Sequence, residues 1–408
     1  MKLWKLAYGG VVLLAGACGS KSNDPCDGVT SGNVCLYAGT GEQGYNVDNP
    51  TAHRLDSQFY WPVDLSFGPD GRPIIVDFNN HKIRRVEKDD SVDLLIGTDY
   101  EGDGPPEMQD RLPLCNPPGA LGTTVALNHP TAVTFGPDGM VYLSAWHDNK
   151  IRALNPENDM VYSLAGDSYG FSGDGGPACM ATFSQPKDVT FDAAGNMYLI
   201  DQRNVRIREI SQGTPMYAPN QMITTWAGVG TKGNSGDGGP ALQAQFGFDT
   251  TNTPQPTGAL VFDEQRGKMY VADSDNNRIR SIDMTTGIID GLAGDESAMA
   301  GFSGDGGQAL QATLSFPVDM ELGPDGRLYE VERMNHVVRA IDLDSGIIQT
   351  VAGQGGVSCD VTDASAKCPD HGSALDMEFW EPNGITFDAQ GNLYVADTRN
   401  NRIMKVVK

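Results

Sequence analysis

The sequence predicts an all-β protein in which six similar four-stranded units close into a ring. Three observations support this prediction. The 50 glycines and 24 prolines among 408 residues suit many short strands joined by turns. The stretch GNLYVADTRNNR, at 391–402, recurs at the same internal spacing in five other places. One strand of the repeat is missing after the last unit and is found at the other end of the chain.

Each unit has an inner apolar strand, a turn with Gly, a second strand, a polar turn, and a third strand with Ile or Val beside a cation. Such alternating runs, broken by Gly, Asp and Asn, are typical of strands. The six copies are VDLSFGPDGRPIIVDFNNHKIRRV (63–86), AVTFGPDGMVYLSAWHDNKIRAL (132–154), DVTFDAAGNMYLIDQRNVRIREI (188–210), ALVFDEQRGKMYVADSDNNRIRSI (259–282), VDMELGPDGRLYEVERMNHVVRAI (318–341) and GITFDAQGNLYVADTRNNRIMKV (384–406).

A fourth strand, ending in a small apolar residue and Gly, follows each unit except the last. It is read at 94–97, 163–166, 225–228, 291–294 and 350–353, and its sixth copy is LYAG at 36–39. A ring of blades must close, and an N-terminal outer strand can complete the C-terminal blade with main-chain hydrogen bonds. The prediction is therefore a six-bladed β-propeller of four-stranded antiparallel blades, closed by this strand, over residues 34–408.

The connections between units are predicted to be folded. Three of them carry a related motif, GFSGDGGPA at 170–178, NSGDGGPA at 234–241 and GFSGDGGQA at 301–309. A large apolar residue then stands three places before Pro, where it is expected to fill the space between blades. These pairs are Phe59 and Pro62, Leu127 and Pro130, Phe183 and Pro186, Leu314 and Pro317, and Phe379 and Pro382.

The units resemble the NHL repeat, whose pattern they match through the strand, GNLYVAD, the turn Asn and the RI pair. The resemblance extends over residues 34–408 and implies a six-bladed β-propeller. The family spans scaffolds, receptors and a few enzymes, so the resemblance leaves the function open.

The N-terminus predicts export. Lys2 and Lys5 precede an apolar run and the small residues before Cys18. The run LLAGAC resembles a bacterial lipoprotein signal, although Ala15 stands where that pattern prefers Leu, and it implies a lipidated Cys18 at the start of the mature chain. The alternative is cleavage near Ala17 and a soluble exported protein. Residues 19–33 are polar and are predicted to form a tether.

Six cysteines remain after Cys18, and an even number in an exported chain points to disulfides. Close spacing suggests Cys26 with Cys35 and Cys359 with Cys368, which leaves Cys115 for Cys179. Six cysteines allow fifteen pairings, so this assignment remains one of several.

The net charge of -24 disfavours nucleic acid as a partner, and the basic residues recur one per repeat without forming a patch. It leaves room for a cationic partner or for divalent cations. Asp174, Asp237 and Asp305 in the Gly-rich connections offer oxygen ligands for calcium. An Asp that closes its own Gly-rich turn is the favoured interpretation, and no cofactor is firmly implied.

The recurrent acids are interpreted as structural. Counted from the turn Gly, position six holds an acid in five units and position nine holds Asn in five, and the cation that follows can pair with the acid. The acids are Asp77, Asp201, Asp273, Glu332 and Asp397, and the cations are Lys82, Lys150, Arg206, Arg278 and Arg402.

A ligand site is sought where the pattern breaks. Unit two has Ala145 in place of the acid, followed by Trp146, His147 and Asp148. His81 occupies the corresponding turn of unit one, and His129 precedes the inner strand of unit two. These histidines could bind a transition metal or could be solvated turn residues. Trp146 is predicted either to meet a partner or to pack under the loop 98–129.

No catalytic motif is present: the chain lacks a GxSxG elbow, an HExxH pair and a P-loop. The predicted function is a binding or scaffold module, anchored in the cell envelope and facing the periplasm or the cell surface, for a protein or carbohydrate ligand. The alternative is a metal-dependent lactonase or lyase with its ion in the central channel. A purely structural envelope protein is a third possibility.

Overall fold

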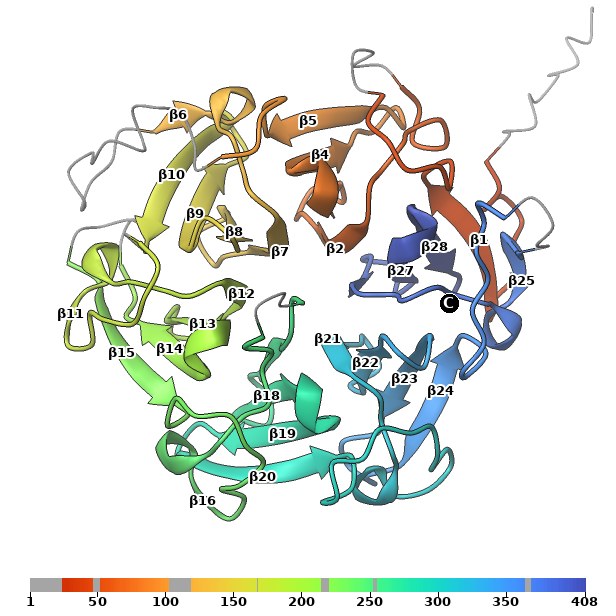
Figure 1. Ribbon diagram of the computed structural model, residues 1–408. Coiled ribbons are helices and arrows are strands. Elements are labelled where there is room, and N and C mark those ends of the chain that lie inside the picture. The colour runs from red at the N-terminus through yellow and green to blue at the C-terminus, as the bar shows by residue number, and fades with distance from the viewer. Residues whose placement is uncertain are drawn as a thin grey trace, which may run out of the picture.

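The computed structural model describes residues 24–46, 52–102, 119–166, 168–213, 220–251, 255–363 and 368–408. Its strands form six antiparallel sheets arranged as blades around a central axis (Figure 1). The predicted all-β, six-bladed architecture is confirmed. Within the described residues, no helix is long and apolar enough to span a membrane.

Each blade runs from an inner to an outer strand. Blade one holds β2 (Pro62–Phe67), β3 (Pro73–Asp77), β4 (Lys82–Val86) and β5 (Val92–Ile96). Blade two holds β7 (Pro130–Phe135), β8 (Val141–Ala145), β9 (Lys150–Asn155) and β10 (Met160–Ala165). Blade three holds β12 (Pro186–Phe191), β13 (Met197–Asp201), β14 (Arg206–Ile210) and β15 (Met222–Ala227). Blade four holds β17 (Leu260–Asp263), β18 (Lys268–Asp273), β19 (Arg278–Asp283) and β20 (Ile288–Ala293). Blade five holds β21 (Pro317–Leu322), β22 (Leu328–Glu332), β23 (Val337–Ile341) and β24 (Ile348–Ala352). Blade six holds β26 (Ile385–Phe387), β27 (Leu393–Asp397), β28 (Arg402–Val406) and β1 (Asn33–Ala38).

Four blades gain a fifth, very short strand that the sequence did not predict. The segments β6 (Ala120–Leu121), β11 (Gly176–Pro177), β16 (Gly239–Pro240) and β25 (His371–Ser373) pair with the outer strands of blades two, three, four and six. Nine 3-10 turns occur among the described residues, and five of them lie in the same connections, immediately after these segments or at the equivalent place. These are η2 (Gly122–Thr124), η3 (Ala178–Met180), η5 (Ala241–Gln243), η7 (Ala309–Gln311) and η8 (Ala374–Asp376).

The other four 3-10 turns form the second turn of their blades, between the second and third strands. They are η1 (Phe78–Asn80), η4 (Gln202–Asn204), η6 (Ser274–Asn276) and η9 (Thr398–Asn400). In an antiparallel blade this turn and the connection to the next blade emerge at the same end of the sheet. We call that end of the propeller the loop face.

Blade six closes the ring as predicted. Figure 1 shows β1, in red, beside β28, in blue. The register pairs Val34 with Val406 and Leu36 with Met404. Because the first and last strands share one sheet, blade six has its full set of four strands and the ring is closed.

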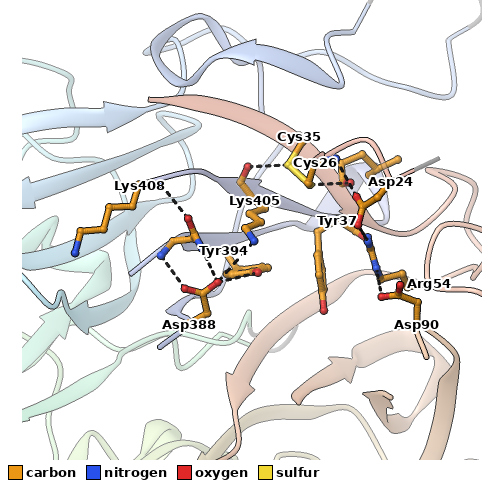
Figure 2. The surroundings of a disulfide bond; sticks show 12 residues. Asp24, Cys26, Cys35, Tyr37, Arg54, Asp90, Asp388, Tyr394, Lys405 and Lys408 are labelled. Carbon is orange, nitrogen blue, oxygen red and sulfur yellow. Dashed lines mark hydrogen bonds and ion pairs between the residues drawn. A yellow bond between two sulfur atoms is a disulfide. The ribbon is translucent and has the colours of Figure 1, made fainter. Parts of the chain in front are cut away.

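A disulfide and an arginine fasten the N-terminal segment to blade six (Figure 2). Cys26 is bonded to Cys35 in β1, with Cα atoms 5.2 Å apart. The buried Arg54 pairs with Asp24 and donates from Nε to Asp90 at 2.7 Å. Residues 24–33 of the predicted tether are therefore packed against the propeller.

The remaining cysteines follow the predicted pairing where the structure describes them. Cys359 is bonded to Cys368. Cys179 is also disulfide-bonded, while Cys115 and Cys18 lie outside the described residues. Disulfides form and persist in oxidising compartments, which indicates an extracytoplasmic location.

Apolar side chains fill the space between neighbouring blades. The predicted plugs Phe59, Leu127, Phe183, Leu314 and Phe379 are each fully buried. Each joins a cluster drawn from two adjacent blades, as Phe183 does between blades two and three. A buried side chain of this size contributes about 1.5–3 kcal/mol, so the connections are held as firmly as the strands they join.

Candidate functional site

The acid at position six, present in every blade except blade two, belongs to a buried ion-pair network and is unavailable to a ligand. Asp201 Oδ2 lies 3.1 Å from Arg208 Nη1, and both side chains are fully buried. Asn204 donates to the same carboxylate and to the carbonyl of Gly170. Burial raises the pKa of Asp201 to about 6, while the hydrogen bonds and Arg208 lower it. The same pairing joins Asp77 to Arg84, Asp273 to Arg280 and Glu332 to Arg339.

The sequence predicted which cation of the third strand pairs with the acid, and this prediction was wrong in most blades. The arginine two residues further along the third strand binds the acid, and only blade six uses the predicted residue, with Arg402 Nε 2.8 Å from Asp397. Lys82 instead donates to the carbonyl of Thr98 at 2.6 Å. Lys82 and Arg84 point to the same side of β4, so alternation alone could not decide between them.

The three candidate calcium ligands are paired with these same arginines. Asp174 lies 2.8 Å from Arg208, Asp237 lies 2.6 Å from Arg280, and Asp305 lies 2.7 Å from Arg339. A guanidinium at this distance neutralises the carboxylate and repels a cation. The carboxylates therefore tie the Gly-rich connections to the blades, which does not fit a calcium site.

The irregular residues of blade two compensate one another. Ala145 supplies no carboxylate, but Asp148 stands at position nine in place of Asn. Its Oδ2 lies 3.8 Å from Arg152 Nη2, and both side chains are buried. In blade two the acid therefore stands three residues later in the chain than in the other blades, and it lies beside the corresponding arginine. Asp148 is thus part of the blade and not a surface ligand.

Trp146 is buried, which favours the packing alternative over direct contact of its indole with a partner. It is 2% exposed. Its Nε1 donates to Gln202 Oε1 at 3.1 Å, across the junction with blade three. Its ring stacks on His147 with 4.3 Å between centroids. The first residue of the second turn points toward the next blade and not toward solvent.

His81 forms a bond that recurs at five of the six blade junctions. The backbone N–H of His129 donates to His81 Nδ1 at 3.0 Å. Elsewhere the acceptor is an Asn, or His336, and the donor is the residue before the first proline of the next blade. The equivalent pairs are Gln185 to Asn149, Phe316 to Asn277, Glu381 to His336 and Trp61 to Asn401. Because Nδ1 accepts, neutral His81 carries its proton on Nε2.

The structure brings the three predicted histidines together on the loop face, between blades one and two. The rings of His81 and His129 lie 4.3 Å apart, and those of His129 and His147 lie 4.7 Å apart, centroid to centroid. The Nδ1 atoms of His129 and His147 are 3.0 Å apart. Glu101 joins the cluster, with Oε1 3.7 Å from His129 Nδ1 and 3.8 Å from His81 Nε2. The sequence analysis missed Glu101, which no pattern marks.

Asn128 completes the cluster from the residue before His129. Its Oδ1 lies 2.7 Å from His129 Nδ1 and 3.3 Å from His147 Nδ1. Burial lowers the pKa of all three histidines, and the neighbouring imidazoles help to bring that of His129 to about 3. The imidazoles are therefore uncharged at neutral pH, the state in which a ring nitrogen can bind a metal or accept a hydrogen bond.

Carboxylates from alternate blades line the central channel. Asp64, Asp188 and Asp319 stand at one position of the inner strands of blades one, three and five, where the other blades have Ala132, Ala259 and Gly384. Each Asp accepts a backbone N–H from the next blade, those of Val133, Leu260 and Ile385, at 2.7–2.8 Å. They border a cavity of about 190 Å³. Sequence analysis missed this alternation, although aligning the units displays it.

Burial and mutual repulsion raise the pKa of these channel groups. The pKa of Asp319 is raised to about 7, first by burial and then by the charge on Asp188, with Lys187 opposing. That of the neighbouring Glu321 is raised to about 8 by burial and by Asp319 and Asp188. The bonds to the next blade give the three Asp side chains a structural role in joining blades.

Exposed apolar side chains are concentrated on the segments that form the loop face and its rim. The described residues include fourteen large apolar side chains that are exposed, and all but Met222 lie in inter-blade connections or, for Met334, in a second turn. Tyr169 is 62% exposed and Phe171 43%. Arg206 lies over the ring of Phe171 at 4.0 Å. Aromatic rings, methionines and arginines of this kind are enriched at binding interfaces.

The six antiparallel blades around one axis define the class of protein: it is a β-propeller, and its longest connections lie on the loop face. The family model described as "NHL repeat" matches residues 379–405. This match lies in blade six, and together with the six-bladed ring it supports an NHL-repeat β-propeller family for the chain.

Curated relatives share the propeller at low identity. The chain is 24% identical to bovine NHL repeat-containing protein 2, with 81% of this chain and 44% of the relative covered. It is 26% identical to teneurin-1 of Caenorhabditis elegans, with 86% and 13% covered. It is 25% identical to protein SUPPRESSOR OF QUENCHING 1 of Arabidopsis thaliana, with 55% and 25% covered. The chain thus spans less than half the length of each of these relatives.

Solved structures with a similar fold come from Bacteroides. A protein of unknown function from Bacteroides thetaiotaomicron superposes with a TM-score of 0.63 at 16% identity, covering 91% of this chain and 75% of that one. An auxiliary nutrient binding protein from Bacteroides ovatus gives 0.59 at 14% identity, covering 92% and 76%. At these identities the similarity concerns the fold alone.

Proposed function

We propose that this protein is an exported binding module that uses its loop face to hold a protein partner at the cell envelope. The observation that carries the proposal is the concentration of exposed aromatic and apolar side chains in the inter-blade connections, which hold all those of the described chain except Met222 and Met334. Such a surface loses solvation on contact with a partner, and its composition matches the buried part of protein interfaces.

Two further observations favour binding. The recurrent acids form ion pairs with buried arginines inside the blades, so they cannot contact a ligand. The connections are the segments left to do so. A solved neighbour of the same fold is described as an auxiliary nutrient binding protein, which makes a binding role a reasonable one for this architecture. The composition of aromatic, Met and Arg side chains favours a protein over a carbohydrate, since arginine and methionine are enriched at protein interfaces.

Anchoring by a lipid on Cys18 is part of the proposal. It rests on the LLAGAC run of the sequence and on the disulfides. A diacylated or triacylated Cys18 would hold the chain at a membrane, since two acyl chains suffice for stable anchoring. Mass spectrometry of the mature N-terminus tests this part; an unmodified N-terminus downstream of Cys18 would refute it.

Affinity capture from envelope extract tests the partner. The bait is the chain with Tyr169→Ala and Phe171→Ala, compared with wild type and with Met222→Ala. Met222 is a matched control because it is 41% exposed, close to Phe171, but begins β15 at the opposite end of the blade. We expect the double variant to lose a protein that wild type and Met222→Ala both retain. Equal recovery by all three baits would contradict the proposal, and retention on a glycan array alone would assign a carbohydrate.

A further inference from the structure

We infer that His129, His147 and Glu101 bind one divalent transition-metal cation, with Zn²⁺ the best fit, while His81 orients the Glu101 carboxylate. The site lies on the loop face, between blades one and two. It goes beyond the proposed partner binding and does not depend on it, because metal and partner are measured separately.

The spacing of the donor atoms suits a tetrahedral ion. Zinc–nitrogen and zinc–oxygen bonds of about 2.0–2.2 Å place tetrahedral ligand atoms about 3.3 Å apart. The two Nδ1 atoms of His129 and His147 are 3.0 Å apart, and Glu101 Oε1 is 3.7 Å from His129 Nδ1. Asn128 Oδ1, at 2.7 and 3.3 Å from the two nitrogens, is placed to serve as a fourth ligand. Among the described residues, His81, Glu101 and His129 offer ligand atoms that all lie within 4.8 Å of one another, and His147 Nδ1 adjoins this group through His129.

The hydrogen bond at the blade junction excludes His81 from direct binding. Its Nδ1 accepts the N–H of His129, so its proton lies on Nε2, and a protonated nitrogen has no lone pair for a metal. That Nε2 faces Glu101 Oε1 at 3.8 Å. At 3.8 Å the pair is an electrostatic contact rather than a hydrogen bond, and it draws the Glu101 carboxylate toward His81, as outer-shell partners of metal ligands do. His81 is therefore a positioning residue.

The surrounding rings hold the imidazoles in place. His147 stacks on Trp146, with an angle of 20° between planes, and Trp146 is anchored by its bond to Gln202. His129 packs against Phe78 with 4.7 Å between centroids. Ligands fixed before binding lose less conformational entropy when the metal arrives. Two imidazoles with one carboxylate favour zinc and its neighbours over calcium or magnesium, which prefer oxygen ligands.

The test is titration of the full exported chain, prepared without a histidine tag and stripped of metal, with Zn²⁺ alone. Isothermal calorimetry gives stoichiometry and affinity, and Co²⁺ absorption reports a four-coordinate site. We expect one ion per chain. His147→Asn should weaken binding at least 100-fold. His81→Asn preserves the junction bond, which Asn makes in three other blades, and should weaken binding about 10-fold. His336→Asn makes the equivalent change at a junction where the described residues show no such cluster and should have no effect.

Several outcomes would overturn the inference. They are a wild-type chain that binds no Zn²⁺ below about 100 μM, His147→Asn binding like wild type, and His81→Asn losing as much as His147→Asn. If His147→Asn lowers the melting temperature of the metal-free chain, Glu101→Gln replaces it. Glu101 is partly exposed, so this change should leave the fold intact, and unchanged Zn²⁺ affinity in it would refute the site.

Discussion

Glu330 offers a sharp test of how the blades are stabilised. It lies in β22 opposite Arg339, at the position where the other blades have Ile75, Leu143, Leu199, Val271 and Val395. Its side chain is fully buried, and neither carboxyl oxygen has a hydrogen-bond partner. Burial, and then the charge on Glu332, raises its pKa well above the usual value, with Arg339 opposing. The folded protein therefore holds this carboxyl in its protonated form.

We expect Glu330→Leu to stabilise the protein. Removing a buried polar group without a partner is worth about 1–3 kcal/mol, and leucine has nearly the same volume and suits the apolar position. The gain depends on pH. A carboxyl whose pKa rises on folding contributes most stability below its unfolded value, near 4.5, and loses it as pH increases. Wild type should lose up to about 1.4 kcal/mol per pH unit from this group above that value, and the variant should not.

Urea unfolding followed by tryptophan fluorescence at pH 5 and pH 8 measures both effects. Glu330→Gln is the control, since it removes the titration but keeps a buried polar group. Glu330→Gln should abolish the pH dependence that Glu330 contributes to the free energy of unfolding, and it should stabilise the protein less than Glu330→Leu does. A Leu variant that is less stable than wild type at pH 8, or a gain equal at both pH values, would refute the assignment of a buried protonated carboxyl.

Three further changes test other parts of the ring. Cys26→Ser should lower the free energy of unfolding by about 2–3 kcal/mol, because the disulfide closes a nine-residue separation; equal melting temperatures of variant and wild type under oxidising conditions would contradict this. Asp319→Asn should raise the melting temperature more at pH 8 than at pH 5, since the pKa of Asp319 is raised to about 7 and its cost to stability grows as pH rises from about 4 to that value; a gain at pH 5 that equals or exceeds the gain at pH 8 would contradict it. Asp148→Asn should destabilise the protein by removing the carboxylate that lies 3.8 Å from the buried Arg152, and Ala145→Asp in the same chain should restore stability, since it recreates the Asp and Asn pattern of the other blades. Failure of that double variant to recover would contradict the exchange of roles within blade two.

The architecture could be predicted because the same strand pattern occurs six times in the sequence. Six copies of one unit, and a fourth strand displaced from the C-terminus to residues 36–39, gave the number of blades and the way the ring closes. The fifth strands could not be predicted in this way. A two-residue ladder such as Gly176 and Pro177 against Met222 and Ile223 has no periodicity of its own and depends on the fold bringing it to the outer strand.

The site was predicted in part. The histidines were singled out because they interrupt the repeat, and the structure brings them together. Glu101 was missed because a lone acid in a connection carries no local signal. For Trp146 the sequence left surface binding and packing both open, because the partner that decides between them, Gln202, comes from the next blade. The alternation of Asp64, Asp188 and Asp319 with small residues was readable from the aligned units and was overlooked because each unit was compared with the consensus and not with its neighbours.

The placement of β1 has a consequence for assembly. Among the described strands the first, β1, is paired with the last, β28, so blade six can form only after both have been synthesised. Until then β1 remains an unpaired edge, and the disulfide between Cys26 and Cys35 can form within the N-terminal segment itself. A chain shortened at either end loses the same junction, which makes the two termini one vulnerable point for proteolysis and for truncation.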